Sequence, residues 1–257
     1  MSWNLFTNYG SIKTNTTKQT TGVSTVASAS SIAVTNNAIN YITGTTGITD
    51  MTGGVLGGIV TLIASAQADG ACVVLNHDSS KISLRDSLNL GIYAGESVTF
   101  KYDGLKWVEI NRNLRTIIEN KATTSAITTI TTTDTSSSTL FASTSSITYD
   151  GATYITLEVF APASSPPAVT NNYVIATVYD GSTNSGYMVE RKTCAANANY
   201  ASFTGISTIR PTAGAHTYNV RLWQTVSGGN VTSGNGGASA YVNGMIRVSR
   251  LLSGYIN

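Results

Sequence analysis

Short runs in which apolar and polar residues alternate recur along most of this chain, with turn residues between them. Alternation with a period of two places apolar side chains on one face of a β-strand, so each run predicts a strand that is buried on one side. Many such strands, with turns about every eight to twelve residues, favour a sandwich or jelly roll. The clearest runs are residues 97–102, 154–160, 173–179, 186–191, 216–224 and 244–251.

Hydroxyl side chains dominate the polar part of the chain. The 257 residues include 39 Thr and 30 Ser, against 15 Lys+Arg and 13 Asp+Glu, and charged residues make up 11%, where about 25% is usual. A net charge of +2 with no basic stripe argues against nucleic-acid binding.

The longest apolar run, 55–66, is interrupted by Gly57 and Gly58 and is shorter than the ~20 residues of a membrane helix. No secretory signal is visible at the start. We expect a soluble protein without membrane insertion.

Residues 1–40 predict an extended N-terminal arm that is rich in Thr, Ser and Asn. Such a segment buries little surface by itself, so it is either disordered or ordered by packing on a partner, and we favour the second reading. Four large apolar side chains lie within its first ten residues, which is unusual for a solvated tail. These candidate anchors are Trp3, Leu5, Phe6 and Tyr9.

Residues 41–112 predict a small β module, with strands at 59–63, 71–75, 97–102 and 106–110. Asp103-Gly104 separates the last two. Hairpin turns require positive φ angles, which Gly, Asn and Asp adopt at low cost, so the pair predicts a hairpin.

Residues 113–138 predict a connector that begins with a short helix and continues as a Thr-rich stretch. Leu114, Ile117 and Ile118 have helical spacing within 113–121, and charged residues occupy the other positions. Because the segment is only about two turns long and lies between β regions, we expect a linker, which could coil around an oligomer axis.

Residues 139–257 predict a C-terminal antiparallel β-sandwich head, jelly-roll-like, in which no fixed period indicates a solenoid. Trp223 and Arg221 share a polar strand face, where the tryptophan either packs under a loop or at an interface or offers a stacking surface to a sugar ring. The glycine-dense stretch 227–237 is expected to be a loop, which is either mobile or a recognition surface. The candidate ligand or interface contacts are Trp223, Arg221, Asn230 and Asn235.

Few residues suit catalysis or metal binding. Two histidines, His77 and His216, are too few for most such sites, and Cys72 and Cys194 form no zinc motif and are expected to stay free rather than paired. No nucleotide-binding or nucleophile motif occurs. We therefore predict no catalytic residue, no metal and no cofactor.

Glycoside hydrolysis is the alternative enzymatic hypothesis, because it needs only two carboxyl groups about 5–10 Å apart. Asp150, Glu158, Asp180 and Glu190 are the candidates. Two of them precede glycine and are better explained as turn residues, and the other two fall on predicted exposed strand faces. A non-enzymatic protein is the preferred reading.

The order of the pieces 42–49, 57–63 and 98–112 resembles a small β module found in fibres, spikes and other virion proteins of tailed bacteriophages. The phrase around Asp103, Gly104, Trp107, Glu109 and Arg112 is its most specific part, and residues 211–223 resemble more loosely the heads of such proteins. The resemblance implies a non-enzymatic, usually homotrimeric virion component. Its N-terminal arm would bind other virion proteins and its head would be displayed.

Two roles remain open beside the enzyme. One is a short tail fibre or tail-tip protein whose head binds a host cell-surface carbohydrate, because 257 residues without repeats cannot build a long shaft. The other is a capsid or tail decoration that stabilises the particle. Both imply assembly in the host cytoplasm and location on the virion.

Overall fold

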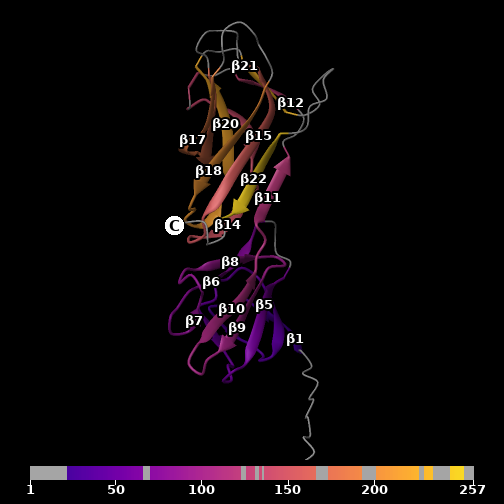
Figure 1. The fold of residues 1–257 in the computed structure, drawn as a ribbon, viewed down its shortest axis with the longest axis vertical. Helices are drawn as coiled ribbons and strands as arrows, with labels where there is room; N and C mark the ends of the chain where they lie inside the picture. Colours follow the sequence, from indigo (N-terminus) through magenta and orange to yellow (C-terminus); the bar gives the residue numbers. More distant parts are fainter. Residues whose placement is uncertain are drawn as a thin grey trace, which may run out of the picture.

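The computed structural model describes residues 22–65, 70–122, 126–130, 133–134, 136–165, 173–192, 201–225, 229–233 and 244–251. Within these ranges the chain forms strands and no helix, so the predicted all-β class is confirmed. It follows that the described part contains no helix able to span a membrane. Figure 1 shows two groups of strands stacked end to end along the long axis of the molecule. We call β1 to β10 the N-terminal module and β11 to β22 the head.

The N-terminal module is built around one six-stranded sheet in the order β1-β3-β5-β9-β10-β7, with β2–β4 and β6–β8 as two-stranded sheets. Its buried apolar side chains form a single core that includes Phe100 and Trp107. The strands are β1 (Gly22–Ala27), β2 (Ser31–Ala33), β3 (Ala38–Thr43), β4 (Asp50–Thr52), β5 (Ile59–Ala64), β6 (Cys72–Leu75), β7 (Ile82–Ser83), β8 (Leu90–Tyr93), β9 (Ser97–Tyr102) and β10 (Trp107–Asn113).

The first strands of this module wind in parallel. β1 pairs with β3 and β3 with β5, all in parallel register, while β2 pairs in parallel with β4 on a second sheet. The chain therefore passes repeatedly from one sheet to the other. Successive partners Gly22, Ala38 and Val60 are separated by 16 and 22 residues, so the winding has no fixed sequence period. Strands β1 and β2 and the start of β3 fall within the range 1–40 that the sequence predicts as an extended arm.

The predicted hairpin joins β9 to β10. Gly104 has a φ of 104°, and the Asp103 carboxylate accepts hydrogen bonds from the backbone N–H groups of Leu105 and Lys106, both at 2.8 Å. Trp107 follows the turn, is 1% exposed, and donates its indole N–H to the Met51 carbonyl at 2.9 Å. The predicted hairpin turn is therefore confirmed, and the tryptophan that follows it is part of the core.

The head is a sandwich of two sheets. One contains β11-β22-β15-β21-β12, with β18 also paired to β15, and the other has the order β13-β20-β16-β17. Apolar side chains of β15 and β22 face those of β16 and β20 across a common core. The strands are β11 (Ile117–Ala122), β12 (Ala126–Ile130), β13 (Thr139–Ser143), β14 (Ile147–Asp150), β15 (Ile155–Ser165), β16 (Tyr173–Asp180), β17 (Thr183–Lys192), β18 (Ala201–Ile209), β19 (Ala213–His216), β20 (Tyr218–Gln224), β21 (Gly229–Ser233) and β22 (Met245–Arg250).

The predicted helical connector is wrong. Residues 117–122 form β11, which pairs antiparallel with β22. Leu114 packs against the core of the N-terminal module, whereas Ile118 packs against the core of the head. An extended chain rises about 3.3 Å per residue, so four residues span roughly 13 Å and can contact both cores. The spacing that suggests one helical face thus serves two separate cores.

The stretch 227–237 also differs from the expected loop in part. Its residues Gly229–Ser233 form β21, which pairs with β12 and with the end of β15. Glycine and asparagine disfavour strands, and here the backbone pairing on both sides overrides that preference.

Candidate functional site at the joint between the modules

The two-stranded sheet β6–β8 lies between the two cores and belongs to both. On β6, Cys72 contacts the core of the head, whereas Val73 and Leu75 contact the core of the N-terminal module. On β8, Tyr93 faces the head and Ile92 faces the other way. Successive side chains of a strand point to opposite faces of the sheet. When both faces are covered by a core, positions on both faces are buried, and the strand is apolar throughout. We call this sheet and the residues bound to it the joint.

A buried ion pair crosses the joint. Glu96, beside β8, and Arg250, at the end of β22, approach to 3.2 Å, and both side chains are 3% exposed. Glu96 also accepts hydrogen bonds from the backbone N–H groups of Tyr93 and Arg115, both at 2.9 Å. Arg250 donates in addition to the Gly91 carbonyl at 2.8 Å. Because both charges have several partners, the cost of burying them is offset and the modules are held in one arrangement.

Asp150 links the head to β8 from the other side. Its carboxylate, which is buried, accepts a hydrogen bond from the Gly91 N–H at 2.7 Å and three more from the backbone and hydroxyl groups of Ala152 and Thr153. Asp150 and Arg250 thus bind the same residue of β8, since Asp150 accepts from the Gly91 N–H and Arg250 donates to the Gly91 carbonyl. A side chain on Gly91 would meet Cys72 Sγ at 3.2 Å and Asp150 Oδ2 at 3.4 Å. The close approach therefore depends on glycine.

Two side chains of the N-terminal module, Cys72 and Tyr93, donate hydrogen bonds to the Thr148 carbonyl, which belongs to β14 of the head. The thiol lies 3.3 Å and the phenol 2.8 Å from that oxygen. Burial raises the pKa of the Cys72 thiol to about 12, and the neighbouring Asp150 carboxylate adds to the effect. Burial likewise raises the pKa of Tyr93. Cys72 is a free cysteine, as predicted, while Cys194 lies outside the described residues.

A cleft of about 580 Å³ opens beside the joint, lined by residues of both modules. The N-terminal side contributes residues 85, 86, 88–90 and 112–114, and the head contributes residues 152–154, Arg250 and Leu251. Three arginines, one aspartate, two asparagines, a threonine and a tyrosine supply its polar groups, and four leucines and an alanine supply apolar ones. Such a mixture of apolar surface with a few convergent polar groups is typical of small-ligand sites.

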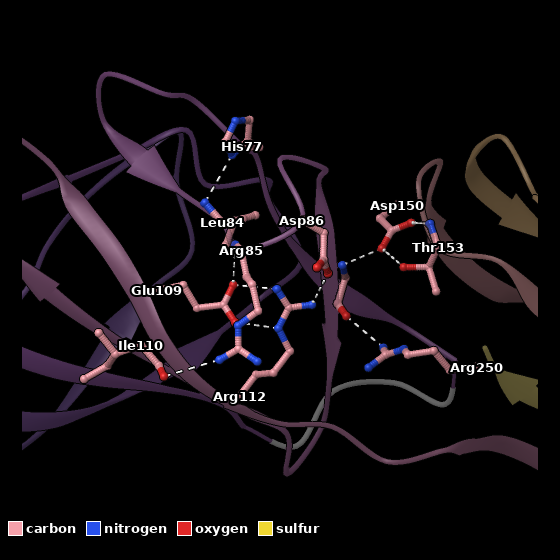
Figure 2. A network of polar contacts seen from close by, with 11 residues as sticks. His77, Leu84, Arg85, Asp86, Glu109, Ile110, Arg112, Asp150, Thr153 and Arg250 are labelled. Carbon is pink, nitrogen blue, oxygen red and sulfur yellow. Dashed lines mark hydrogen bonds and ion pairs between the residues drawn. The ribbon is translucent and has the colours of Figure 1, made fainter. Parts of the chain in front are cut away.

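A polar network fixes one side of the cleft. The Arg112 guanidinium lies between the Glu109 carboxylate, at 2.6 Å from Nη2, and the Asp86 carboxylate, at 2.8 Å from Nη1. Glu109 also accepts the backbone N–H of Arg85 at 3.0 Å, and the Arg85 side chain donates to the Ile110 carbonyl at 3.3 Å. Figure 2 shows this arrangement. The cleft side chains are therefore positioned before any ligand arrives.

Sequence patterns gave no indication of this site. Its polar residues come from segments that are far apart in the chain. In its local sequence, each of them is typical of an ordinary surface position. The one local signal is Glu96, a carboxylate between two apolar strands. Its burial shows that it needs a cation.

Two of the predicted contact residues lie on the outer face of β20, away from the joint. Trp223 donates its indole N–H to Thr177 Oγ1 at 3.0 Å. Arg221 donates to the Ser138 carbonyl at 3.0 Å, and its guanidinium lies 5.4 Å from the centre of the Tyr179 ring. Both side chains therefore have partners within the head, and their role toward a ligand stays a prediction.

The remaining predicted contacts lie wholly or in part outside the described residues. Asn230 lies in β21, where its backbone pairs with Thr129 and Ser165, and its side chain is outside the described part of the structure. Asn235 and the predicted anchors Trp3, Leu5, Phe6 and Tyr9 also lie outside the described residues.

The carboxylates considered for glycoside hydrolysis each have a structural partner where they are described. Asp150 binds the joint, Glu158 pairs with Arg247 at 3.3 Å, and Asp180 contacts His216 Nδ1 at 2.6 Å. The other ring nitrogen of His216 contacts the Thr212 carbonyl at 3.0 Å. The side chain of Glu190 is outside the described residues.

His77 lies in the N-terminal module and binds the backbone there. His77 Nδ1 accepts the Leu84 backbone N–H at 3.1 Å, so this imidazole has a structural partner. In the described part of the chain, His, Cys, Asp and Glu do not gather in groups of three or more that could hold a metal ion.

No protein-family model matches this chain, and no curated protein matches it. Similar solved structures include the C-terminal CBM6 of LamC, a marine laminarinase from Zobellia galactanivorans. It has 10% identity and a TM-score of 0.26, and the match covers 52% of this chain and 92% of that one.

Two further similar structures come from infectious bursal disease virus. The Gt strain structure has 12% identity and a TM-score of 0.32, with 63% of this chain and 45% of that chain covered. The T=1 particle structure has 10% identity and a TM-score of 0.32, with 74% and 53% covered. The chain thus spans about half the length of these viral chains. TM-scores this low do not indicate a function for this chain.

Proposed function

We propose that this chain is a non-enzymatic structural component of a tailed-phage virion, a homotrimeric short fibre or tail-tip protein that displays the head. The observation that carries the proposal is the joint. A protein that works by contact must hold its displayed part in a fixed position relative to its attached part. The buried Arg250–Glu96 pair and the sheet shared by both cores give this chain such a connection.

An exposed apolar face on the N-terminal module supports self-association. Val23, Tyr41 and Ile59 lie on the same outer face of the β1-β3-β5 sheet and are 67%, 37% and 41% exposed. Exposed apolar groups gathered on one face favour an interface. Hydroxyl side chains around such a face avoid charge repulsion between identical copies.

The test measures mass and location. Light scattering of the purified full chain at micromolar concentration is expected to give three times the 26.9 kDa chain mass, and antibodies against it should label the tails of particles. A monomer together with unlabelled particles would refute the proposal. Particles that lack the protein separate the two roles: a receptor-binding fibre predicts lost adsorption, whereas a decoration predicts normal adsorption and earlier failure on heating.

A further inference from the structure

We infer that the cleft beside the joint binds an acidic saccharide, a short oligosaccharide that carries a carboxylate. This inference concerns the cleft alone and does not depend on where the protein is displayed. It places ligand binding at a different position from the predicted contacts Arg221 and Trp223, which do not line the cleft.

The first argument is the size and lining of the cleft. Its volume of about 580 Å³ falls within the range of roughly 300–1,000 Å³ that is usual for small-ligand sites. A sugar ring has an apolar face and an edge of hydroxyl groups. Leu88 and Leu251 offer apolar contacts to such a face, while Asn89, Asn113 and Asp86 carry planar groups that can bind adjacent hydroxyls.

The second argument is a guanidinium that has no ion-pair partner among the described residues. Within the described residues, two of the three cleft arginines are neutralised, Arg112 by Glu109 and Asp86 and Arg250 by Glu96. Arg85 forms no ion pair with any described residue, and its side chain donates only to the Ile110 carbonyl. A guanidinium binds a carboxylate with two parallel hydrogen bonds, so Arg85 offers a binding partner to an acidic group on the ligand.

Calorimetric titration of the purified full chain tests the inference with matched pairs of ligands. The probes are trisaccharides of galacturonic, glucuronic and mannuronic acid, each compared with its carboxyl-reduced, neutral counterpart. We expect at least one uronate trisaccharide to bind about tenfold more tightly than its neutral counterpart, because a charge-assisted pair with Arg85 is lost in the latter.

Two variants locate the binding. Arg85→Gln is expected to weaken the preferred uronate about tenfold and to leave the neutral counterpart unchanged. Lys101→Gln removes the same charge from an exposed position at the far end of β9, and should leave both affinities unchanged. Circular dichroism and thermal melting of both variants confirm folding.

Three results would overturn the inference. The first is that no uronate binds better than its reduced counterpart. The second is that Arg85→Gln and Lys101→Gln weaken the uronate equally, which would indicate non-specific charge attraction. The third is that inorganic phosphate binds as tightly as the uronate, which would show that the cleft selects charge and not a sugar.

Discussion

Arg250 and Glu96, which are 154 residues apart in the chain, form an ion pair with both side chains almost fully buried. One belongs to the last strand of the head and the other to the N-terminal module. No other ion pair within the described residues is buried on both sides to this extent. This buried charge pair therefore acts together with the shared β6–β8 sheet and the Asp150–Gly91 hydrogen bond to fix the orientation of the head.

Removing one member of this pair should be strongly destabilising. Arg250→Met removes the buried cation from Glu96 and leaves only the partly exposed Arg115, whose Nε lies 3.8 Å from the carboxylate. We expect a loss of about 3–5 kcal/mol in the free energy of unfolding, measured in urea. The double variant Glu96→Gln/Arg250→Met should recover part of this loss. Arg247→Met is the matched control, because its pair with Glu158 is about one-third exposed and should cost ~1 kcal/mol or less. Equal losses for Arg250→Met and Arg247→Met would contradict the role assigned to the joint.

Gly91 should not tolerate a side chain. Gly91→Ala brings a methyl group to 3.2 Å from Cys72 Sγ and close to Asp150, so we expect a loss of about 1–3 kcal/mol from overpacking. Gly22→Ala places its methyl at 3.6 Å from Ala38, an ordinary contact, and serves as the control. Thermal unfolding of both variants measures the difference, and a neutral Gly91→Ala would show that the two modules are less closely packed than described.

Cys72 should be inert in the folded protein and should make stability depend on pH at the alkaline end. Its pKa is about 12 in the fold against 9.0 for the free group, so the native state holds the proton more strongly than the unfolded state does. The contribution to stability is therefore complete below pH 9 and falls as the pH rises from 9 toward 12.

Two measurements check this. Iodoacetamide labelling at pH 8, located by peptide mapping, should modify Cys72 only after unfolding. In Cys72→Ala the decline in stability above pH 9 should be smaller than in the parent, with the remaining decline due to buried tyrosines such as Tyr93. Rapid labelling of Cys72 in the native protein would show that the joint opens.

The extended path of residues 114–118 can be tested by single truncations. Ile118→Ala removes a side chain that packs on the head core and should cost about 1–3 kcal/mol, whereas Ile117→Ala, at a position 44% exposed, should cost less than about 1 kcal/mol. Chemical denaturation gives both values. In a helical connector with one apolar face, the two truncations would have similar costs.

The parts of the fold that follow from local pattern are the parts that sequence predicts well. The alternation in β9 and the Asp103-Gly104 turn require only neighbouring residues, and both occur as predicted. The parallel winding of β1, β3 and β5 was missed because its successive partners are 16 and 22 residues apart, which leaves no repeat to detect. Leu114 and Ile118 misled the helix prediction because their spacing is that of a helical face, while each packs on a different core.

The candidate site could not be predicted for a different reason. Glu96, Arg250 and Arg85 come together only through the stacking of the two modules, and no spacing in the chain encodes that arrangement. The predicted contacts Arg221 and Trp223 were placed correctly on the polar face of their strand. What the pattern could not show is that each already binds a neighbour in the head.

The sheet β6–β8 couples the unfolding of the N-terminal module to that of the head. Because its two faces complete two separate hydrophobic cores, neither core can melt without exposing apolar groups of the other. Calorimetry should therefore show one cooperative transition for what would otherwise be two, and a force that pulls the ends of the molecule apart must break both cores at once.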